Sequence, residues 1–203
     1  MVSGILFGFQ SVIILIVLTR TIALSDVGIF TLAYANASLF LLIGKYGVRN
    51  YQVSDVGGEH SFQDYKVARY FSVLLMLLCT LALLLYGTAV NQYPWRKSIV
   101  ILLVCLFKVP DALEDVYFGE YQRAGRLDIA AKAMSLRLGI SVALLCAMLV
   151  ITGELVVSLS WAVMVSFLGM RILLQWTLPL FRVDYRLQWR SVWGILKACF
   201  PLA

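Results

Sequence analysis

Six apolar stretches, each long enough to cross a lipid bilayer, constrain the fold of this chain more than any other feature. A helix rises about 1.5 Å per residue, so roughly 20 apolar residues cover about 30 Å of hydrocarbon. A transmembrane β-strand would instead alternate apolar and polar residues over about ten positions, and these stretches do not alternate. The sequence therefore predicts an all-α polytopic membrane protein. The six predicted spans are residues 4–24, 27–44, 70–90, 98–118, 129–151 and 155–181.

The composition agrees with this class of protein. Of the 203 residues, 62% are hydrophobic and 14% are charged, whereas an average soluble domain has about 25% charged residues. The first stretch has no positively charged leader and a second span follows it at once, which favours a first helix over a cleaved signal peptide. The cysteines lie in apolar sequence without metal-ligand spacing, so we expect core or lipid-facing residues and neither ligands nor disulfides. They are Cys79, Cys105, Cys146 and Cys199.

The basic residues indicate how the chain crosses the membrane. The formal net charge is +6, but most Lys and Arg residues lie in the connections that follow the second, fourth and sixth spans. The positive-inside rule assigns these connections, and both termini, to the cytoplasm. We therefore predict a multi-pass protein of the cytoplasmic membrane that contacts membrane lipids and does not bind nucleic acid.

Two polar segments predict local structure outside the spans. Ser61, with Asp64 three residues later, resembles a capping box that begins the third helix before its span. Residues 182–203 alternate Arg182, Arg186 and Arg190 with Trp and apolar residues, as an interfacial helix does, and end in the start of a seventh apolar segment. We expect a six-helix transmembrane lobe over residues 1–181, an interfacial carboxy-terminal helix over 182–203, and an interrupted chain.

The fourth span carries four ionisable residues, Lys108, Asp111, Glu114 and Asp115, at what corresponds to membrane depth. Helical spacing puts Lys108, Asp111 and Asp115 on one face and Glu114 on its flank. A carboxylate that faces lipid costs several kcal/mol, so this stripe is expected to face protein or a water-filled cavity.

Three interpretations of this stripe remain open. Lys108 pairs with Asp111 in a structural arrangement, with the other groups at the headgroups. Alternatively, the stripe is a polar contact in the lumen, for ion coupling or for a substrate. The third interpretation takes "DALED" as the DxxxD with which membrane prenyltransferases hold Mg²⁺ and a diphosphate, but the second acidic motif of that chemistry is missing.

Four arginines near the ends of the spans, Arg20, Arg49, Arg137 and Arg171, form a second candidate set. An arginine fork binds phosphate oxygens in a bidentate manner, so several that face one cavity would attract a diphosphate. Each of them could instead extend to the lipid headgroups.

The sequence contains no catalytic constellation. It has no GxSxG, no Gly-rich phosphate loop and no metal-binding His pair. Its single histidine, His60, lies in a polar connection beside Glu59 and is expected to be solvated. We therefore expect a protein that is not an enzyme, with no cofactor and no metal site.

Two segments carry a resemblance to a known family. They are "LTRTIALSDVGIFTLAYANASLFLLIGKYGVRNYQVSD", residues 18–55, and "DALEDVYFGEYQRAGRLDIAAK", residues 111–132. An Arg closes the first span, VGIF begins the second, and a Gly-x-x-Gln-Arg turn follows the fourth. The chain thus resembles the amino-terminal lobe of polysaccharide flippases in the multidrug/oligosaccharidyl-lipid/polysaccharide exporter superfamily.

The resemblance implies one lobe of a MATE-like exporter fold, which works with a second six-helix lobe in the same chain or in another subunit. It implies translocation of an undecaprenyl-diphosphate-linked oligosaccharide from the inner to the outer leaflet in polysaccharide or O-antigen (lipopolysaccharide) biosynthesis. Arg20 and Arg49 match basic positions of the family, whereas Arg137 and Arg171 are assigned to the diphosphate from their depth alone. A multidrug or cation antiporter of the same superfamily, and a non-transporting membrane scaffold subunit, are the alternatives.

Overall fold

The computed structural model describes residues 2–55, 57–180 and 187–200, and within these ranges the chain is helical without strands. The predicted all-α class is therefore confirmed. A single 3₁₀ turn, Leu178–Leu180, follows the seventh helix. The helices are α1 (Val2–Thr21), α2 (Leu24–Lys45), α3 (Val48–Ser54), α4 (Phe62–Asn91), α5 (Trp95–Arg123), α6 (Leu127–Thr152), α7 (Leu155–Thr177) and α8 (Trp189–Cys199).

Four helical segments are long and apolar enough to cross a membrane, which supports the membrane class. They are Leu24–Ser54, Phe62–Asn91, Leu127–Thr152 and Leu155–Thr177. The apolar part of α1 is shorter, Gly8–Thr21. Helix α5 has 29 residues and at about 1.5 Å per residue is long enough to cross, but its charged residues set it apart from the four. The count of six spans therefore remains a prediction.

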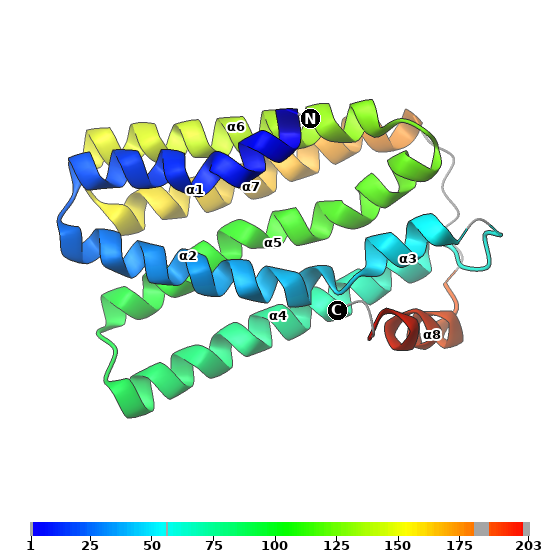
Figure 1. The fold of residues 1–203 in the computed structure, drawn as a ribbon, viewed down its shortest axis with the longest axis horizontal. Helices are drawn as coiled ribbons and strands as arrows, with labels where there is room; N and C mark the ends of the chain where they lie inside the picture. Colours follow the sequence, from blue (N-terminus) through cyan, green and yellow to red (C-terminus); the bar gives the residue numbers. More distant parts are fainter. Residues whose placement is uncertain (1, 56, 181–186, 201–203) are drawn as a thin grey trace.

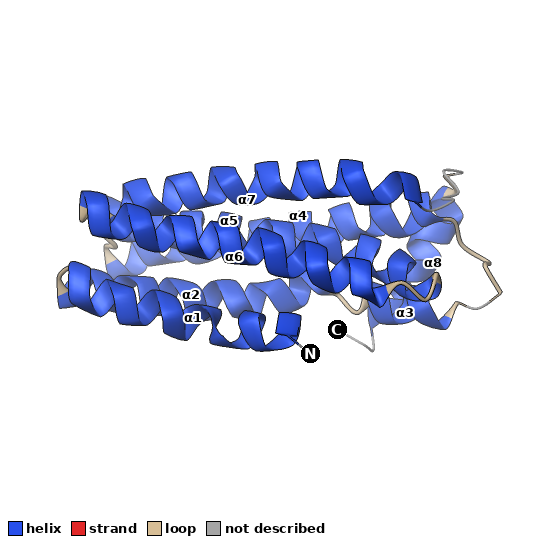
Figure 2. Ribbon diagram, turned by 90° about the horizontal axis from the view of Figure 1, so that it is seen from above, coloured by secondary structure: helices blue, strands red, loops and turns tan. Residues whose placement is uncertain are grey.

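Helix α5 is the centre of the bundle. It runs diagonally between α1, α6 and α7 above and α4 below, and crosses α2 (Figure 1), and it packs against α2, α4, α6 and α7. Seen from above, α2 and α7 lie on opposite sides of α5 (Figure 2). Because neighbours surround α5, its side chains meet protein nearly all around its circumference.

The bundle has two distinct ends. The α1–α2, α4–α5 and α6–α7 connections lie together at one end (Figure 1), where Arg96 forms ion pairs with Asp26 at 3.1 Å and with Glu154 at 3.3 Å. We refer to it as the Arg96 end. Helix α3, the α5–α6 connection and α8 lie at the opposite end, referred to as the α8 end. The basic connections after the second and fourth predicted spans lie at the α8 end.

The predicted capping box begins α4. The Ser61 side chain accepts a hydrogen bond from the Asp64 backbone N–H at 3.2 Å, and Asp64 accepts one from the Ser61 backbone N–H at 3.1 Å. Helix α4 therefore begins well before the predicted span at residue 70. Helix α2 ends where Tyr46 and Gly47 both adopt positive φ angles, 45° and 64°. This left-handed turn separates α2 from α3.

Helix α8 is the described part of the predicted carboxy-terminal helix. It is seen nearly end-on in Figure 1, so it crosses the direction of the long helices. Val192, Ile195 and Cys199 are buried in an apolar cluster with residues of α3 and α4, while Trp189 and Trp193 are 59% and 58% exposed. Residues 195–199 continue α8 and do not start a separate helix. Arg182 and Arg186 lie outside the described residues, and Arg190 is exposed on α8.

Candidate functional site

The four ionisable residues of α5 lie inside the bundle. Lys108, Asp111, Glu114 and Asp115 are 1%, 6%, 3% and 7% exposed. Since α5 is surrounded by other helices, none of the four needs to face lipid. This position agrees with the large cost of exposing a carboxylate to hydrocarbon.

Lys108 connects α5 to the first two helices. Its Nζ donates to Gln10 Oε1 of α1 at 2.9 Å and to the Tyr34 hydroxyl of α2 at 3.0 Å. The same ammonium lies 4.5 Å from the centre of the Tyr34 ring and 3.6 Å from Asp111 Oδ2. The ion pair between Lys108 and Asp111 that the structural interpretation required is therefore present.

Arg137 of α6 joins the two carboxylates nearest to it. Its Nη2 donates to Asp111 Oδ1 at 2.5 Å, and its Nε lies 2.8 Å from Glu114 Oε1. Its Nη1 donates to Ser166 Oγ of α7 at 2.7 Å. We use the term α5 quartet for three of the α5 residues together with this arginine of α6, namely Lys108, Asp111, Glu114 and Arg137. The quartet combines two formal positive and two formal negative charges. Buried charges of this kind require pairing, because removing one partner typically costs about 3–5 kcal/mol.

Asp115 makes a separate set of contacts, with residues of α3 and α4. Its Oδ2 accepts from Arg69 Nη2 of α4 at 2.7 Å, and its Oδ1 lies 3.6 Å from Arg49 Nη1 of α3. Arg69 Nη1 also donates to the carbonyls of Gly44 and Lys45 at the end of α2. The last carbonyls of a helix lack partners within it, so a buried arginine there satisfies them.

Arg69 is the residue of this site that sequence reasoning missed. It lies immediately before the predicted third span, in a basic connection from which the sequence predicts only the topology. Its full burial follows from the early start of α4, which places it within the helix and inside the bundle. The capping box at Ser61 was the signal that could have revealed this, because it moves the helix start eight residues before the predicted span.

The structure brings two of the four predicted arginines to α5 and leaves two exposed. Arg137 is enclosed in the α5 quartet, and Arg49 contacts Asp115 and donates to Gln122 Oε1 at 2.8 Å. Arg20 is exposed near the end of α1, at the Arg96 end. Arg171 is exposed on α7. It lies 16 residues after the start of that helix at the Arg96 end, which corresponds to about 24 Å along the helix axis. The four therefore do not surround one cavity in this conformation.

A cavity of about 510 Å³ lies against Arg171. It is lined by residues of α4, α5 and α7 and of the 3₁₀ turn, at the α8 end of the bundle. The described residues of the lining include two cationic side chains, Lys66 and Arg171, and no carboxylate. Its residues are Lys66, Tyr70, Leu113, Tyr117, Met170, Arg171, Leu174, Gln175, Leu178 and Pro179.

The two aspartates of "DALED" face different cations. Asp111 contacts Lys108 and Arg137, and Asp115 contacts Arg69 and Arg49. A shared divalent cation would need both carboxylates directed at one point, which this arrangement does not provide. Within the described ranges, no group of three or more His, Cys, Asp or Glu side chains is placed to hold a metal ion.

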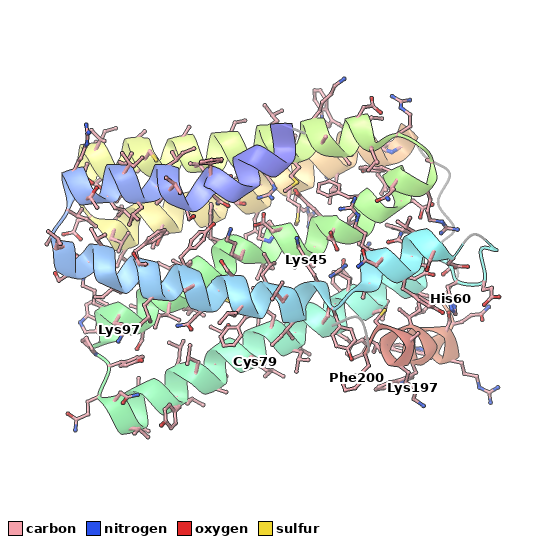
Figure 3. The ribbon with its side chains drawn as sticks, viewed as in Figure 1. Lys45, His60, Cys79, Lys97, Lys197 and Phe200 are labelled. Atoms are coloured by element: carbon pink, nitrogen blue, oxygen red, sulfur yellow. The ribbon has the colours of Figure 1, made fainter. Side chains whose placement is uncertain are left out.

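The connection before α4 is ordered by Asp55, and His60 is not the solvated residue expected from the sequence. Asp55 accepts from the backbone N–H of Glu59 and from the Tyr65 hydroxyl, at 3.0 and 2.8 Å. Burial acts to raise the pKa of Asp55, but these hydrogen bonds outweigh it and lower the pKa below its ordinary value. His60 is half-buried, with Nδ1 2.5 Å from Ser191 Oγ, and so lies against α8 (Figure 3).

Comparisons with protein-family models, with curated proteins and with solved structures find no match for this chain.

Proposed function

We propose that this chain is one lobe of a membrane transporter that moves an undecaprenyl-diphosphate-linked oligosaccharide from the inner to the outer leaflet. The observation that carries the proposal is the α5 quartet, four charged side chains buried among long apolar helices. Ionisable groups inside membrane helices are expensive and typically mark transport pathways or coupling sites. The family resemblance of the sequence supports the substrate class.

In this proposal the α5 quartet couples ion or proton binding to helix movement. Glu114 Oε2 is buried and has no hydrogen-bond partner in the described part of the chain, so it is an acceptor for a proton. Protonation of Glu114 would remove its attraction to Arg137 and loosen α6 from α5. Pro110 lies one residue before Asp111 inside α5 and lacks the N–H that an unbroken helix would use there. The helix is therefore easiest to bend beside the quartet.

The substrate contacts fall to the arginines outside the quartet. Arg137 is fully engaged by Asp111, Glu114 and Ser166, so we assign it a coupling role and not a phosphate contact. Arg20, Arg49 and Arg171 keep accessible guanidinium groups and remain the residues predicted to meet the diphosphate. The proposed topology has six spans, α1, α2, α4, α5, α6 and α7, with the α8 end in the cytoplasm and a second six-helix lobe across the cavity.

A non-transporting scaffold subunit is the second candidate, and the charge balance of the α5 quartet favours it. Each charge of the quartet has an ion-pair partner on its own or the neighbouring helix, which is also what a rigid brace between helices requires. The antiporter alternative has less support, because an organic cation needs an uncompensated carboxylate and Asp111, Glu114 and Asp115 each contact a cation.

Complementation of a flippase-deficient bacterium tests the proposal. The chain would be expressed alone and together with the carboxy-terminal lobe of a characterised polysaccharide flippase, and surface polysaccharide and membrane-inserted protein would be measured. We expect the paired form to restore polysaccharide and Glu114→Gln to abolish it at unchanged protein level. The matched control is Glu59→Gln, which changes an exposed glutamate outside the quartet. Full membrane insertion without any export from either form would reject the transporter and leave the scaffold.

A further inference from the structure

The cavity at Arg171 has the composition of an anion site. Lys66 of α4 and Arg171 of α7 contribute two positive charges to its lining. Within the described ranges Arg171 makes no ion pair or hydrogen bond, unlike Arg49, Arg69 and Arg137, which each contact a carboxylate of α5. Among the described residues of the lining, no acidic group compensates this positive charge.

Two tyrosines add hydrogen-bonding capacity beside these cations. Tyr70 of α4 and Tyr117 of α5 line the same cavity, and the Lys66 ammonium lies 5.9 Å from the centre of the Tyr70 ring. Phenol hydroxyls donate to phosphate oxygens as well as accept from ammonium groups. The site can thus offer an ammonium, a guanidinium and two hydroxyls to one phosphate.

The position of the cavity along the bundle matches a lipid headgroup. Lys66 and Tyr70 lie in the first three turns of α4, and Arg171 lies in the last two turns of α7, at the basic α8 end. Tyrosine is enriched at the level where headgroups meet hydrocarbon. Beyond the cavity, toward the middle of the bundle, Leu74 of α4 and Leu168 of α7 expose apolar surface.

The remainder of the lining suits a hydrocarbon chain. Leu113, Met170 and Leu174 form the apolar wall, and about 510 Å³ falls within the range of roughly 300–1,000 Å³ typical of small-molecule sites. A free inorganic phosphate would gain nothing from these side chains, whereas a lipid buries part of its tail on them.

From these observations we infer that the cavity between α4 and α7 is a binding site for the phosphate headgroup of an anionic lipid in the leaflet at the α8 end. Lys66 and Arg171 contact the phosphate oxygens, Tyr70 and Tyr117 donate hydrogen bonds, and the tail lies along the apolar surfaces of α4 and α7. The site is separate from the α5 quartet, and its occupation does not depend on whether the chain transports a substrate.

Lipid titration of the purified full chain tests this site. Fluorescent phosphatidylglycerol would be titrated into the protein in neutral detergent, with phosphatidylcholine, undecaprenyl diphosphate, inorganic phosphate and pyrophosphate as competitors. We expect phosphatidylglycerol to bind at least tenfold more tightly than phosphatidylcholine, and Lys66→Gln with Arg171→Gln to weaken it about tenfold or more. Competition by undecaprenyl diphosphate would place that lipid among the ligands of the same site.

A matched pair of exposed basic residues provides the control. Arg126→Gln with Lys132→Gln removes the same charge at the same end of the bundle and is expected to change affinity less than twofold. Equal losses in the two double variants would show a general charge effect and overturn the site. Displacement by inorganic phosphate as effective as that by lipid would overturn the lipid assignment. Arg171→Gln alone changes an exposed side chain, so it tests the site if the double variant fails to fold.

Discussion

At the scale of single residues, the charged groups of α5 owe their burial to partners from other helices. Asp111 and Glu114 share the guanidinium of Arg137, and Lys108 is held by Gln10 and Tyr34. Each of these interactions offsets part of the free-energy cost of burying a charge away from water. Because two carboxylates share one guanidinium, we expect the stability of the quartet to depend on the balance of its positive and negative charges.

Substitution of Arg137 tests this balance. Arg137→Gln leaves Asp111 and Glu114 without their shared cation and is expected to lower the free energy of unfolding by about 3–5 kcal/mol. Adding Glu114→Gln removes one of the unpaired charges and should recover part of that loss. The measurement is thermal unfolding in detergent at neutral pH, with exposed Arg126→Gln as control. A strictly additive loss in the double variant would contradict an energetic coupling within the quartet.

At the scale of the helices, features set by neighbouring residues could be predicted from the sequence, whereas the packing of one helix against another could not. The capping box at Ser61 is local, so the sequence alone predicted it and the structure contains it. The apolar runs likewise placed the long helices, and their ends differ by at most five residues from the predicted spans except at the start of α4, which lies eight residues earlier. The partners of α5 were not predictable, because helical spacing gives the face of a residue but not the helix opposite. Arg137 and the α5 carboxylates were accordingly treated as two unrelated sets, and the contact of His60 with α8 was missed.

The contribution of the cap can be measured against a neighbouring serine. Ser61→Ala removes the acceptor for the Asp64 N–H and is expected to cost about 1 kcal/mol, seen as faster hydrogen exchange in the first turn of α4. The control is Ser54→Ala, whose hydroxyl only donates to the Tyr51 carbonyl at 2.8 Å. Equal exchange in the two variants would mean that packing, and not the cap, holds the start of α4.

At the scale of the whole molecule, the charged helix is also the central one. Composition identifies four apolar helical segments, and α5 lies among them with its charges directed at its neighbours. The count of six spans concerns how the bundle sits in a membrane, and the flippase function concerns what the bundle moves. Both remain predictions. A direct topology measurement addresses the count.

Cysteine labelling on the two sides of α5 determines whether this helix crosses the membrane. In a chain with Cys79, Cys105, Cys146 and Cys199 replaced by serine, a cysteine is introduced at exposed Asn91 or at exposed Arg126. We expect a membrane-impermeant maleimide to label position 91 in intact cells and position 126 only after permeabilisation. Labelling of both positions from the same side would show that α5 does not span.

If α5 spans the membrane as predicted, its ion pairs with α6 also affect the order in which the chain can enter a bilayer. During synthesis Gln10 and Tyr34 precede α5 and can receive Lys108 at once, but Arg137 is made later than Asp111 and Glu114. If α5 entered the bilayer before α6, the carboxylates of Asp111 and Glu114 would lie unpaired in hydrocarbon, at a cost of several kcal/mol. Entry of α5 and α6 as a preformed helical hairpin avoids this, and the short connection between Arg123 and Leu127 keeps the two helices close enough to do so.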